Sequence, residues 1–241
     1  MLYETRSALS GRIRVVERGR ERRLMIGGEI QSVYFPGGDW SPAAREYWAR
    51  ALAPACALRH PPRVLLIGLG GGTQVHLLRR AAGATLITAV EHDPLVIQVA
   101  RDWFGLEALD RLEILCADAA AAVHQLRRQR RRFDFIMDDI SYAAPPARAI
   151  RLARSLARLL APAGTIVLNQ HRRPAAQAVA EAVTDLLPSV RLERVRQAVE
   201  NVLIVARRDG AAAACAHGRP AGSRFPPTGP ARPGQPRRSF L

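Results

Sequence analysis

Blocks of consecutive apolar residues alternate along most of the chain with segments in which apolar residues recur every three or four positions. The blocks, such as VLLIG at 64–68 and FDFIMDD at 133–139, predict strands that are buried on both faces of a sheet. The segments with the longer period, such as PLVIQVARDWF at 94–104, predict amphipathic helices. Strands that alternate with helices in this way predict a parallel sheet covered by helices.

The same pattern gives the order of the elements. The predicted strands are 64–68, 86–91, 112–118, 133–139 and 164–170, followed by 189–196 and 201–208, which form an antiparallel hairpin at the edge of the sheet. The predicted helices are 73–80, 94–104, 119–130, 147–160 and 174–187. We therefore expect an α/β fold with a doubly wound, mostly parallel, seven-stranded sheet.

The two ends of the chain follow other patterns. Short apolar alternations between Arg-rich and Gly-Gly segments over 12–34 predict a small β meander, and Ser41 and Pro42 predict the start of a helix over 41–58. After Arg208 the chain is mostly Ala, Gly, Pro and Arg without periodic apolar positions, which predicts disorder. We expect a β-strand subdomain over 1–40, the main domain over 41–208, and a disordered, basic tail over 209–241.

The formal net charge is +15, and all 36 basic residues are Arg, so no Lys is present for a Schiff base or a Walker-type phosphate loop. From residue 207 onward, seven Arg and one Asp supply +6 of this charge. The run RRQRRR at 127–132 precedes a predicted buried strand, which favours a solvated helix end. No aromatic-rich recognition module accompanies the charge, so a nucleic-acid partner is not expected.

Cysteine spacing and hydropathy exclude further classes of protein. Cys56, Cys116 and Cys215 form no CxxC pair, so neither a disulfide framework nor a zinc site is expected. No apolar stretch approaches the length of about 20 residues that spans a bilayer, and the first residues lack the pattern of a signal peptide. A cytoplasmic protein without membrane attachment and without a metal is expected.

The segment RVLLIGLGGGTQVHLLRR at 63–80 carries the first candidate chemistry. Its strand ends in a glycine turn formed by Gly68, Gly70, Gly71 and Gly72. Such a turn is expected to leave backbone N–H groups free at the positive end of the next helix, where a ribose-bearing ligand can approach them closely. Glu91 ends the second strand about 20 residues later, where a carboxylate can accept hydrogen bonds from ribose hydroxyls. A nucleoside site is therefore predicted.

Three more carboxylates lie at the ends of predicted strands. Asp118 follows the third strand, and Asp138 and Asp139 end the fourth. The carboxyl ends of adjacent parallel strands face one crevice, so Glu91, Asp118 and Asp139 are expected to converge. The turn reads G-L-G-G-G-T rather than G-x-G-x-x-G, which favours a nucleoside-sulfonium donor over a nicotinamide cofactor.

Five segments resemble the spermidine synthase family, the polyamine aminopropyltransferases, which have the class I S-adenosylmethionine-dependent methyltransferase fold. They are IGGEIQSVY, VLLIGLGGGT, AVEHDPLVIQVAR, ILCADA and FDFIMDDIS. These segments are similar to the family's L-D-G-x-x-Q, V-L-x-I-G-G-G-D-G, E-x-D-x-x-V-I-x-x-A/S, G-D-A/G and D-V-I-x-x-D-x-x-D patterns. The resemblance covers residues 13–207 and implies that 41–208 is a nucleoside-binding, Rossmann-like transferase domain.

The resemblance also assigns roles by position. It implies that Glu91 binds the ribose of the donor, that Asp118 lies near its adenine and Gln31 near its thioadenosine, and that Asp139 helps to deprotonate the acceptor amine. It further implies decarboxylated S-adenosylmethionine or S-adenosylmethionine as co-substrate, a small-molecule acceptor such as an amine, a place in polyamine biosynthesis, and a homodimer. Tyr47 and Tyr142 are expected on the acceptor side.

The sequence departs from the family pattern at three acids. Gly71 replaces Asp in the glycine loop, Tyr142 replaces the second Asp of D-x-x-D, and Ala49 replaces the Glu of Y-x-E. All three positions belong to the half of the site that holds amines. Burying an unpaired ammonium costs several kcal/mol, so the loss of these acids bears directly on which acceptor is used.

Three functions therefore stay open. The first is aminopropyl transfer to an amine, because the N-terminal segment and Asp139 are both retained. The second is methyl transfer to a less cationic acceptor, although Leu66 stands where methyltransferases commonly carry an acid for the methionine amino group, and Asp138 or Glu46 would have to replace it. The third is a non-catalytic protein that keeps the nucleoside pocket.

Overall fold

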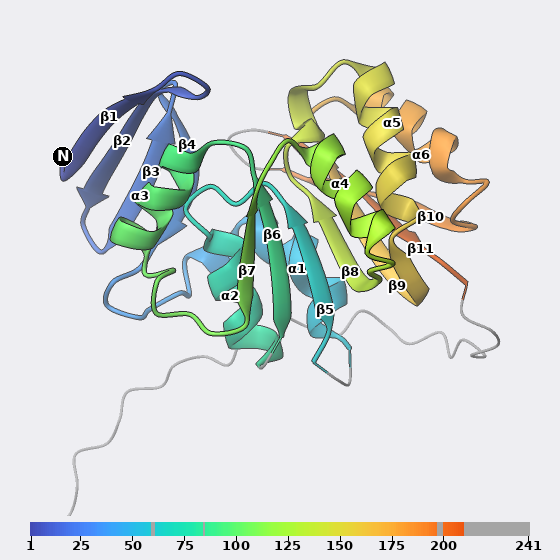
Figure 1. Cartoon of the computed structure of the whole chain (residues 1–241), viewed down its shortest axis with the longest axis horizontal. Coiled ribbons are helices and arrows are strands. Elements are labelled where there is room, and N and C mark those ends of the chain that lie inside the picture. The colour runs from blue at the N-terminus through green and yellow to red at the C-terminus, as the bar shows by residue number, and fades with distance from the viewer. Residues whose placement is uncertain (59–60, 84, 197–199, 210–241) are drawn as a thin grey trace, which may run out of the picture.

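The computed structural model describes residues 1–58, 61–83, 85–196 and 200–209. The described residues form a four-stranded antiparallel sheet beside a seven-stranded sheet that is flanked by helices (Figure 1). Most of the predicted tail lies outside the described residues. None of the helices among the described residues is long and apolar enough to cross a membrane.

The N-terminal sheet contains one strand that the sequence did not predict. Its strands, in the order β1-β2-β3-β4, are β1 (Tyr3–Ser7), β2 (Gly11–Arg18), β3 (Glu21–Ile26) and β4 (Glu29–Tyr34). The predicted meander corresponds to β2 to β4. β1 pairs with β2 over five residues as an edge strand, and its sequence YETRS lacks the apolar alternation by which a strand is recognised.

The large sheet has the predicted doubly wound topology. Its strands are β5 (Arg63–Ile67), β6 (Leu86–Glu91), β7 (Leu112–Cys116), β8 (Phe133–Asp138), β9 (Leu160–Gln170), β10 (Ser189–Val195) and β11 (Asn201–Arg207). Their order is β10-β11-β9-β8-β5-β6-β7, with β5 to β9 parallel and β11 antiparallel to both neighbours. The predicted mostly parallel, seven-stranded sheet with a terminal hairpin is confirmed.

The helices begin close to where the pattern placed them, with one exception. They are α1 (Tyr47–Cys56), α2 (Thr73–Ala82), α3 (Pro94–Phe104), α4 (Ala119–Arg128), α5 (Pro146–Ala157) and α6 (Arg173–Val183), with 3₁₀ turns at Ala43–Arg45 and Ser141–Ala143. The prediction of a continuous helix from Ser41 is wrong, because Glu46 has extended backbone angles (φ −82°, ψ 163°) that separate the first 3₁₀ turn from α1.

Two apolar layers hold the helices against the sheet. One layer includes Leu52 of α1 and Leu78 of α2, and the other includes Leu126 of α4 and Leu156 of α5, so these two pairs of helices cover opposite faces. Each large side chain buried in this way contributes roughly 1.5–3 kcal/mol to folding. The N-terminal sheet packs its own apolar residues on α3, around the fully buried Phe104.

The register of the parallel strands places the candidate residues at one level. Ile67 of β5 pairs with Val90 of β6 on one side and with Asp138 of β8 on the other. The residues that follow these positions, Gly68, Glu91 and Asp139, therefore leave the sheet side by side at its carboxyl edge.

Candidate functional site

A cavity of about 300 Å³ opens at the carboxyl ends of β5, β6 and β8. It is lined by Leu9, Ser10, Ile26, Gln31, Ser32, Trp48, Gly68, Leu69, Gly70, Thr73, Gln74, Glu91, His92, Val96, Asp139, Ile140 and Tyr142. A wider surface hollow of about 610 Å³ lies between the β2–β3 turn and the loop after β4, away from these strand ends. The smaller cavity therefore holds the candidate chemistry.

The glycine loop between β5 and α2 takes a path that only glycine follows without strain. Gly68, Gly70 and Gly72 have φ angles of +98°, +52° and +80°, and a Cβ at Gly70 would lie 2.6 Å from Oγ of Ser32. The loop is also tied to the N-terminal sheet, because the amide of Gly71 donates a 2.8 Å hydrogen bond to Oγ of Ser32. This backbone cradle is closely packed by neighbouring side chains, and its residues Gly68 and Gly70 line the cavity.

Glu91 is fixed at the edge of this cradle. Its Oε2 accepts hydrogen bonds from the amides of Leu69 and Gly70 at 3.4 and 3.3 Å. Its Oε1 accepts from the amides of His92 and Asp93 at 2.8 and 3.1 Å. Backbone donors that follow two strand ends thus hold one carboxylate in place beside the cavity, and its predicted role in binding ribose stays a prediction.

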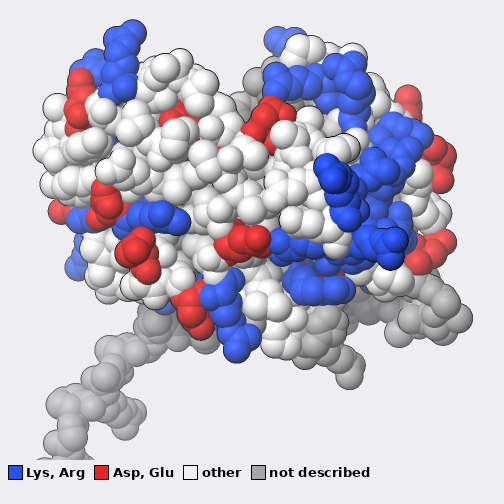
Figure 2. Space-filling model, viewed as in Figure 1, with Lys and Arg blue, Asp and Glu red and all other residues white. Residues whose placement is uncertain are grey.

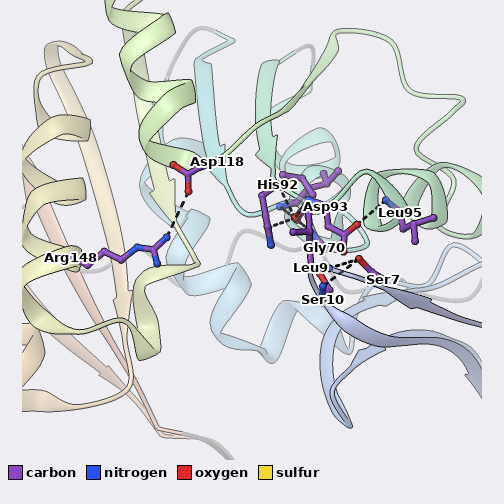
Figure 3. Close-up of polar contacts among 11 residues, drawn as sticks. Ser7, Leu9, Ser10, Gly70, His92, Asp93, Leu95, Asp118 and Arg148 are labelled. Carbon is purple, nitrogen blue, oxygen red and sulfur yellow. Dashed lines mark hydrogen bonds and ion pairs between the residues drawn. The ribbon is translucent and has the colours of Figure 1, made fainter.

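The tip of the β1–β2 hairpin forms another wall of the cavity, which no pattern in the sequence indicated. Asp93 caps α3 by accepting a 2.9 Å hydrogen bond from the amide of Leu95, and the hairpin residues Ser7 and Ser10 lie against it (Figure 3). Burial raises the pKa of Asp93, but hydrogen bonds from Ser10 and Ser7 outweigh burial and hold it below its usual value. The N-terminal sheet therefore contributes directly to the cavity.

Asp139 is held by three side chains from three other elements. Its Oδ2 accepts hydrogen bonds from Oη of Tyr47 at 2.9 Å and from Nε2 of Gln74 at 2.7 Å, and its Oδ1 accepts from Nδ2 of Asn169 at 2.9 Å. All three donors are neutral. The carboxylate is thus oriented without being paired to a cation, so its charge is free to attract one.

Burial controls the protonation of this group. It raises the pKa of Asp139 to about 6, and the charge of neighbouring Asp138 acts in the same direction, while the hydrogen bonds from Asn169, Tyr47 and Gln74 oppose the rise. Burial and the Asp139 charge also raise the pKa of Tyr47 well above its usual value, so its hydroxyl remains a donor. A carboxylate with a pKa near 6 can accept a proton at neutral pH.

Tyr142, which was predicted on the acceptor side, lines the cavity. Its ring stacks on that of His171 with centroids 4.5 Å apart, and the amide of His171 donates to the carbonyl of Tyr142 at 3.3 Å. Burial raises the pKa of Tyr142, and a hydrogen bond from Gln31 partly offsets this effect. The predicted residues Gln31, Tyr142 and Asp139 therefore lie together around one end of the cavity.

Several other predicted residues lie outside the cavity lining. Asp118 is exposed, caps α4 through the amide of Ala120 at 2.8 Å, and pairs with Arg148 at 3.7 Å, on the far side from His92 in Figure 3. Asp138 is buried behind the lining and accepts from the amide of Ile140 at 3.2 Å. Gly71, Gly72 and Tyr47 shape the lining from behind, and their roles stay predictions.

The three lost acids are not replaced by other carboxylates in the cavity lining, although the charge of Glu29 acts on Tyr142 and His171 from outside the lining. A Cβ at Gly71 would lie 2.9 Å from Cδ1 of Phe104 and 3.0 Å from Cβ of Ser32, so a larger side chain there would have to displace one of these neighbours. Ala49 is buried, and Tyr142 occupies the third position. Among the residues that line the cavity, the carboxylates are those of Glu91 and Asp139.

Sequence reasoning missed Gln74 and Asn169, the amides that orient Asp139. Gln74 lies in the first turn of α2 and Asn169 near the end of β9, where the sequence NQ was interpreted as the end of a core strand. The polar Asn169 at the end of an otherwise apolar strand was the signal in the sequence that could have indicated this role, because a buried amide needs hydrogen-bond partners.

A glycine cradle after the first parallel strand, an acid after the second and a second acid after the fourth define a nucleoside-binding transferase with the class I methyltransferase fold. A comparison with protein families identifies it further: the Spermine/spermidine synthase domain matches residues 51–202, more than half of the chain. The chain belongs to this family, and with it to the transferases.

Individual proteins of two kinds are similar to this chain. The "eEF1A lysine and N-terminal methyltransferase" of Danio rerio is 32% identical over 162 residues, which are 62% of this chain and 24% of that protein. Human methyltransferase-like protein 13, solved in complex with SAH, superimposes with a TM-score of 0.60 at 24% identity over 71% of this chain and 86% of that one. Spermidine synthase from Thermotoga maritima superimposes with a TM-score of 0.67 at 18% identity over 86% of this chain and 72% of that one.

The similar solved structures show the fold, and the match to the family model shows the family. The chain spans about a quarter of the length of the Danio rerio methyltransferase. The seven-stranded methyltransferase-like fold is therefore confirmed, and an S-adenosylmethionine-type co-substrate agrees with the cradle at Gly70 and with the carboxylate of Glu91.

Proposed function

We propose that this chain transfers a methyl group from S-adenosylmethionine to an amine nitrogen of a protein or peptide. The observation that carries the proposal is the acceptor side of the cavity, where the one lining carboxylate is that of Asp139, oriented by Tyr47, Gln74 and Asn169. One carboxylate can receive one ammonium group. A diamine such as putrescine carries two, and desolvating the second without a partner costs several kcal/mol.

The glycine loop supports the choice of donor. An acid at position 71 would attract the free ammonium of an aminopropyl group and repel the carboxylate of S-adenosylmethionine. Phe104 and Ser32 fill the space that such an acid would need at Gly71. The loop instead carries no negative charge at this position, which favours the carboxylated donor.

The chemistry that follows is a direct displacement. Asp139, ionised above pH 6, holds the acceptor ammonium and takes one of its protons. The nitrogen lone pair then attacks the methyl carbon as the carbon–sulfur bond breaks, and the sulfonium becomes the neutral thioether of S-adenosylhomocysteine. Because the sulfonium is a good leaving group, alignment of nitrogen, carbon and sulfur is the main contribution of the protein.

Relatives that are named eEF1A lysine and N-terminal methyltransferases support this proposal, since that name includes both lysine and N-terminal amines. Aminopropyl transfer is the second candidate. Gln31 and Asp139, which the family resemblance links to thioadenosine and to amine deprotonation, both line the cavity. The sequence analysis placed aminopropyl transfer first, and the filled space at Gly71 reverses that order.

The test uses the full chain with two donors and three acceptors. S-adenosylmethionine with a tritiated methyl group, or decarboxylated S-adenosylmethionine, is offered with a peptide that has a free N-terminus, with an N-acetylated lysine peptide, and with putrescine. We expect label on a peptide amine and no aminopropyl adduct by mass spectrometry. An aminopropyl adduct of putrescine would contradict the proposal, and so would the absence of any transfer, which would favour the non-catalytic alternative.

A further inference from the structure

Two neighbouring surface helices carry a high density of positive charge. Residues 119–132, which contain α4 and the loop after it, and residues 146–158, which contain α5, include nine Arg and no Asp or Glu. We call the surface formed by these residues the α4–α5 face. Its arginines are Arg127, Arg128, Arg130, Arg131, Arg132, Arg148, Arg151, Arg154 and Arg158. Figure 2 shows basic side chains gathered over these helices.

Most of these cations are not paired with an acid. Arg131 pairs with Glu113, Arg148 with Asp118 at 3.7 Å, and Arg154 with Asp185 at 2.8 Å. Within the part of the chain that the structure describes, the six other arginines of the face form no salt bridge. The face thus has an excess of positive charge that the fold itself does not compensate.

Charge is arranged differently on the N-terminal sheet. There, Arg12 pairs with Glu4 at 2.9 Å and Arg22 with Glu17 at 3.0 Å. The overall richness in Arg therefore does not by itself produce a one-signed surface. On α5, Arg148, Arg151 and Arg154 follow one another at intervals of three residues, and residues at this spacing are neighbours on the helix surface, where like charges repel.

The helix dipole explains only part of the pattern. Cations are favourable in the last turn of a helix, which accounts for Arg127 and Arg128 on α4 and for Arg154 on α5. It does not account for Arg148 and Arg151, which lie in the first half of α5. A solvated helix end, as the sequence analysis favoured for 127–132, is therefore an incomplete explanation of the whole face.

The composition of the face indicates what kind of polyanion it fits. The large hydrophobic residues that are exposed on the described surface are Met1, Leu2, Leu9, Ile30, Leu86, Ile140 and Leu192, and none belongs to α4 or α5. Protein interfaces normally have an apolar core, whereas contacts with a phosphate backbone need only cations. The two segments also lack aromatic residues, on which bases of single strands would stack.

We propose that the α4–α5 face binds the phosphate backbone of a nucleic-acid duplex without reading its sequence. From Arg148 to Arg158, α5 carries cations over about 15 Å, a length that faces several phosphates of a duplex. No nucleic-acid partner was expected from the sequence, because the chain lacks an aromatic-rich recognition module. Such a module serves to read bases. Backbone binding does not require such a module.

The test compares two full-length variants that each lose four positive charges. One, R127Q/R128Q/R151Q/R158Q, changes the face, and the control, R6Q/R14Q/R18Q/R20Q, changes the N-terminal sheet. Both keep the tail. Fluorescein-labelled 20-base-pair duplexes, one of RNA and one of DNA, are titrated by anisotropy at several salt concentrations, with polyglutamate as competitor. Thermal melting by circular dichroism checks that both variants are folded.

We expect the face variant to lose about tenfold or more in affinity and its log–log salt slope to fall by roughly 3 to 4, while the control changes less than about threefold. The RNA and DNA arms show which duplex is preferred. Equal losses in both variants would overturn the proposal, since charge alone would then explain binding. Competition by polyglutamate at an equal concentration of charge would also overturn it and would indicate an acidic protein partner.

Discussion

The hydroxyl of Tyr47 donates a 2.9 Å hydrogen bond to Oδ2 of Asp139, and this contact joins the start of α1 to the end of β8. Gln74 from α2 and Asn169 from β9 donate to the same carboxylate. Four elements that are distant in sequence therefore define the position of one acid. Since no cation is among these partners, Asp139 can hold an acceptor amine and take its proton.

Replacing Asp139 by Asn should reduce turnover while sparing the binding of the donor. The amide cannot accept a proton, and general-base catalysis typically contributes about 10²–10⁴-fold to a rate. We expect kcat to fall by at least about 100-fold, measured as methyl transfer to peptide amines, with unchanged affinity for S-adenosylhomocysteine by calorimetry. Asp102→Asn, an exposed acid on α3, is the matched control. Undiminished turnover would remove the role of Asp139.

The rate of transfer should rise with pH through the pKa of Asp139, which burial raises to about 6. The carboxylate holds the acceptor and takes its proton only when it is ionised, so kcat should increase between pH 5 and pH 7 as this group loses its own proton. The profile is measured at saturating donor and acceptor. A rate that is flat across this range would contradict the assignment.

The raised pKa of Asp139 also predicts how the stability of the wild type, relative to Asp139→Asn, changes with pH. Asp139 binds its proton more tightly in the folded chain than in the unfolded chain, where the pKa is about 3.9, so its contribution to stability is lost as pH rises from about 4 to 6. The melting temperature of the wild type relative to Asp139→Asn should therefore fall over this interval. A difference that is constant with pH would contradict burial as the cause of the shift.

Removing the Tyr47 hydroxyl should move the pH profile rather than abolish activity. The hydrogen bond from Tyr47 lowers the pKa of Asp139, so Tyr47→Phe should shift the acidic limb of the profile to higher pH. Tyr3→Phe, in the N-terminal sheet, is the control. A lower rate with an unshifted limb would show that Tyr47 acts on the acceptor in another way.

Glu91→Gln should weaken the binding of S-adenosylmethionine and S-adenosylhomocysteine by at least about tenfold, because a hydrogen bond to a charged group contributes roughly 1.5–3 kcal/mol. The amide would also bring an N–H group against the donors at Leu69, Gly70, His92 and Asp93. Affinity is measured by calorimetry, with Glu107→Gln as an exposed control. Equal affinities would overturn the location of the donor site.

Gly71→Ala should lower the stability of the chain, because its new Cβ would lie 2.9 Å from Cδ1 of Phe104. Overpacking of this kind typically costs about 1–3 kcal/mol, so the melting temperature should fall by several degrees. Gly37→Ala is the matched control, because nothing lies within 4 Å of its Cβ position. A stable Gly71→Ala chain would show that Phe104 can move and that space for an acid can form.

The local pattern of apolar and polar residues was sufficient to predict most of the fold. The strand at Leu86–Glu91 and the helix at Pro94–Phe104 have the predicted bounds, because an apolar block and an N-terminal proline mark them in the sequence itself. β1 was missed because an edge strand needs no apolar alternation. The start of α1 was misplaced because the backbone of Glu46 is extended, which neither Ser41 nor Pro42 indicates.

The candidate site, like the fold, was predicted where local sequence pattern determines it and missed where tertiary packing does. The glycine loop and Glu91 were predicted from spacing, because adjacent parallel strands end at one edge. The support of Asp139 by Gln74 and Asn169 depends on how α2 and β9 pack against β8, and no spacing in the sequence encodes that contact. The seating of the β1–β2 hairpin tip beside Asp93 was missed for the same reason.

The most direct test of the proposed function is a calorimetric titration of the full chain with S-adenosylmethionine and with decarboxylated S-adenosylmethionine under identical conditions. A site without an acid at Gly71 should prefer the carboxylated donor, so tighter binding of S-adenosylmethionine is the predicted result. Tighter binding of the decarboxylated donor would contradict methyl transfer and restore aminopropyl transfer as the function of this site.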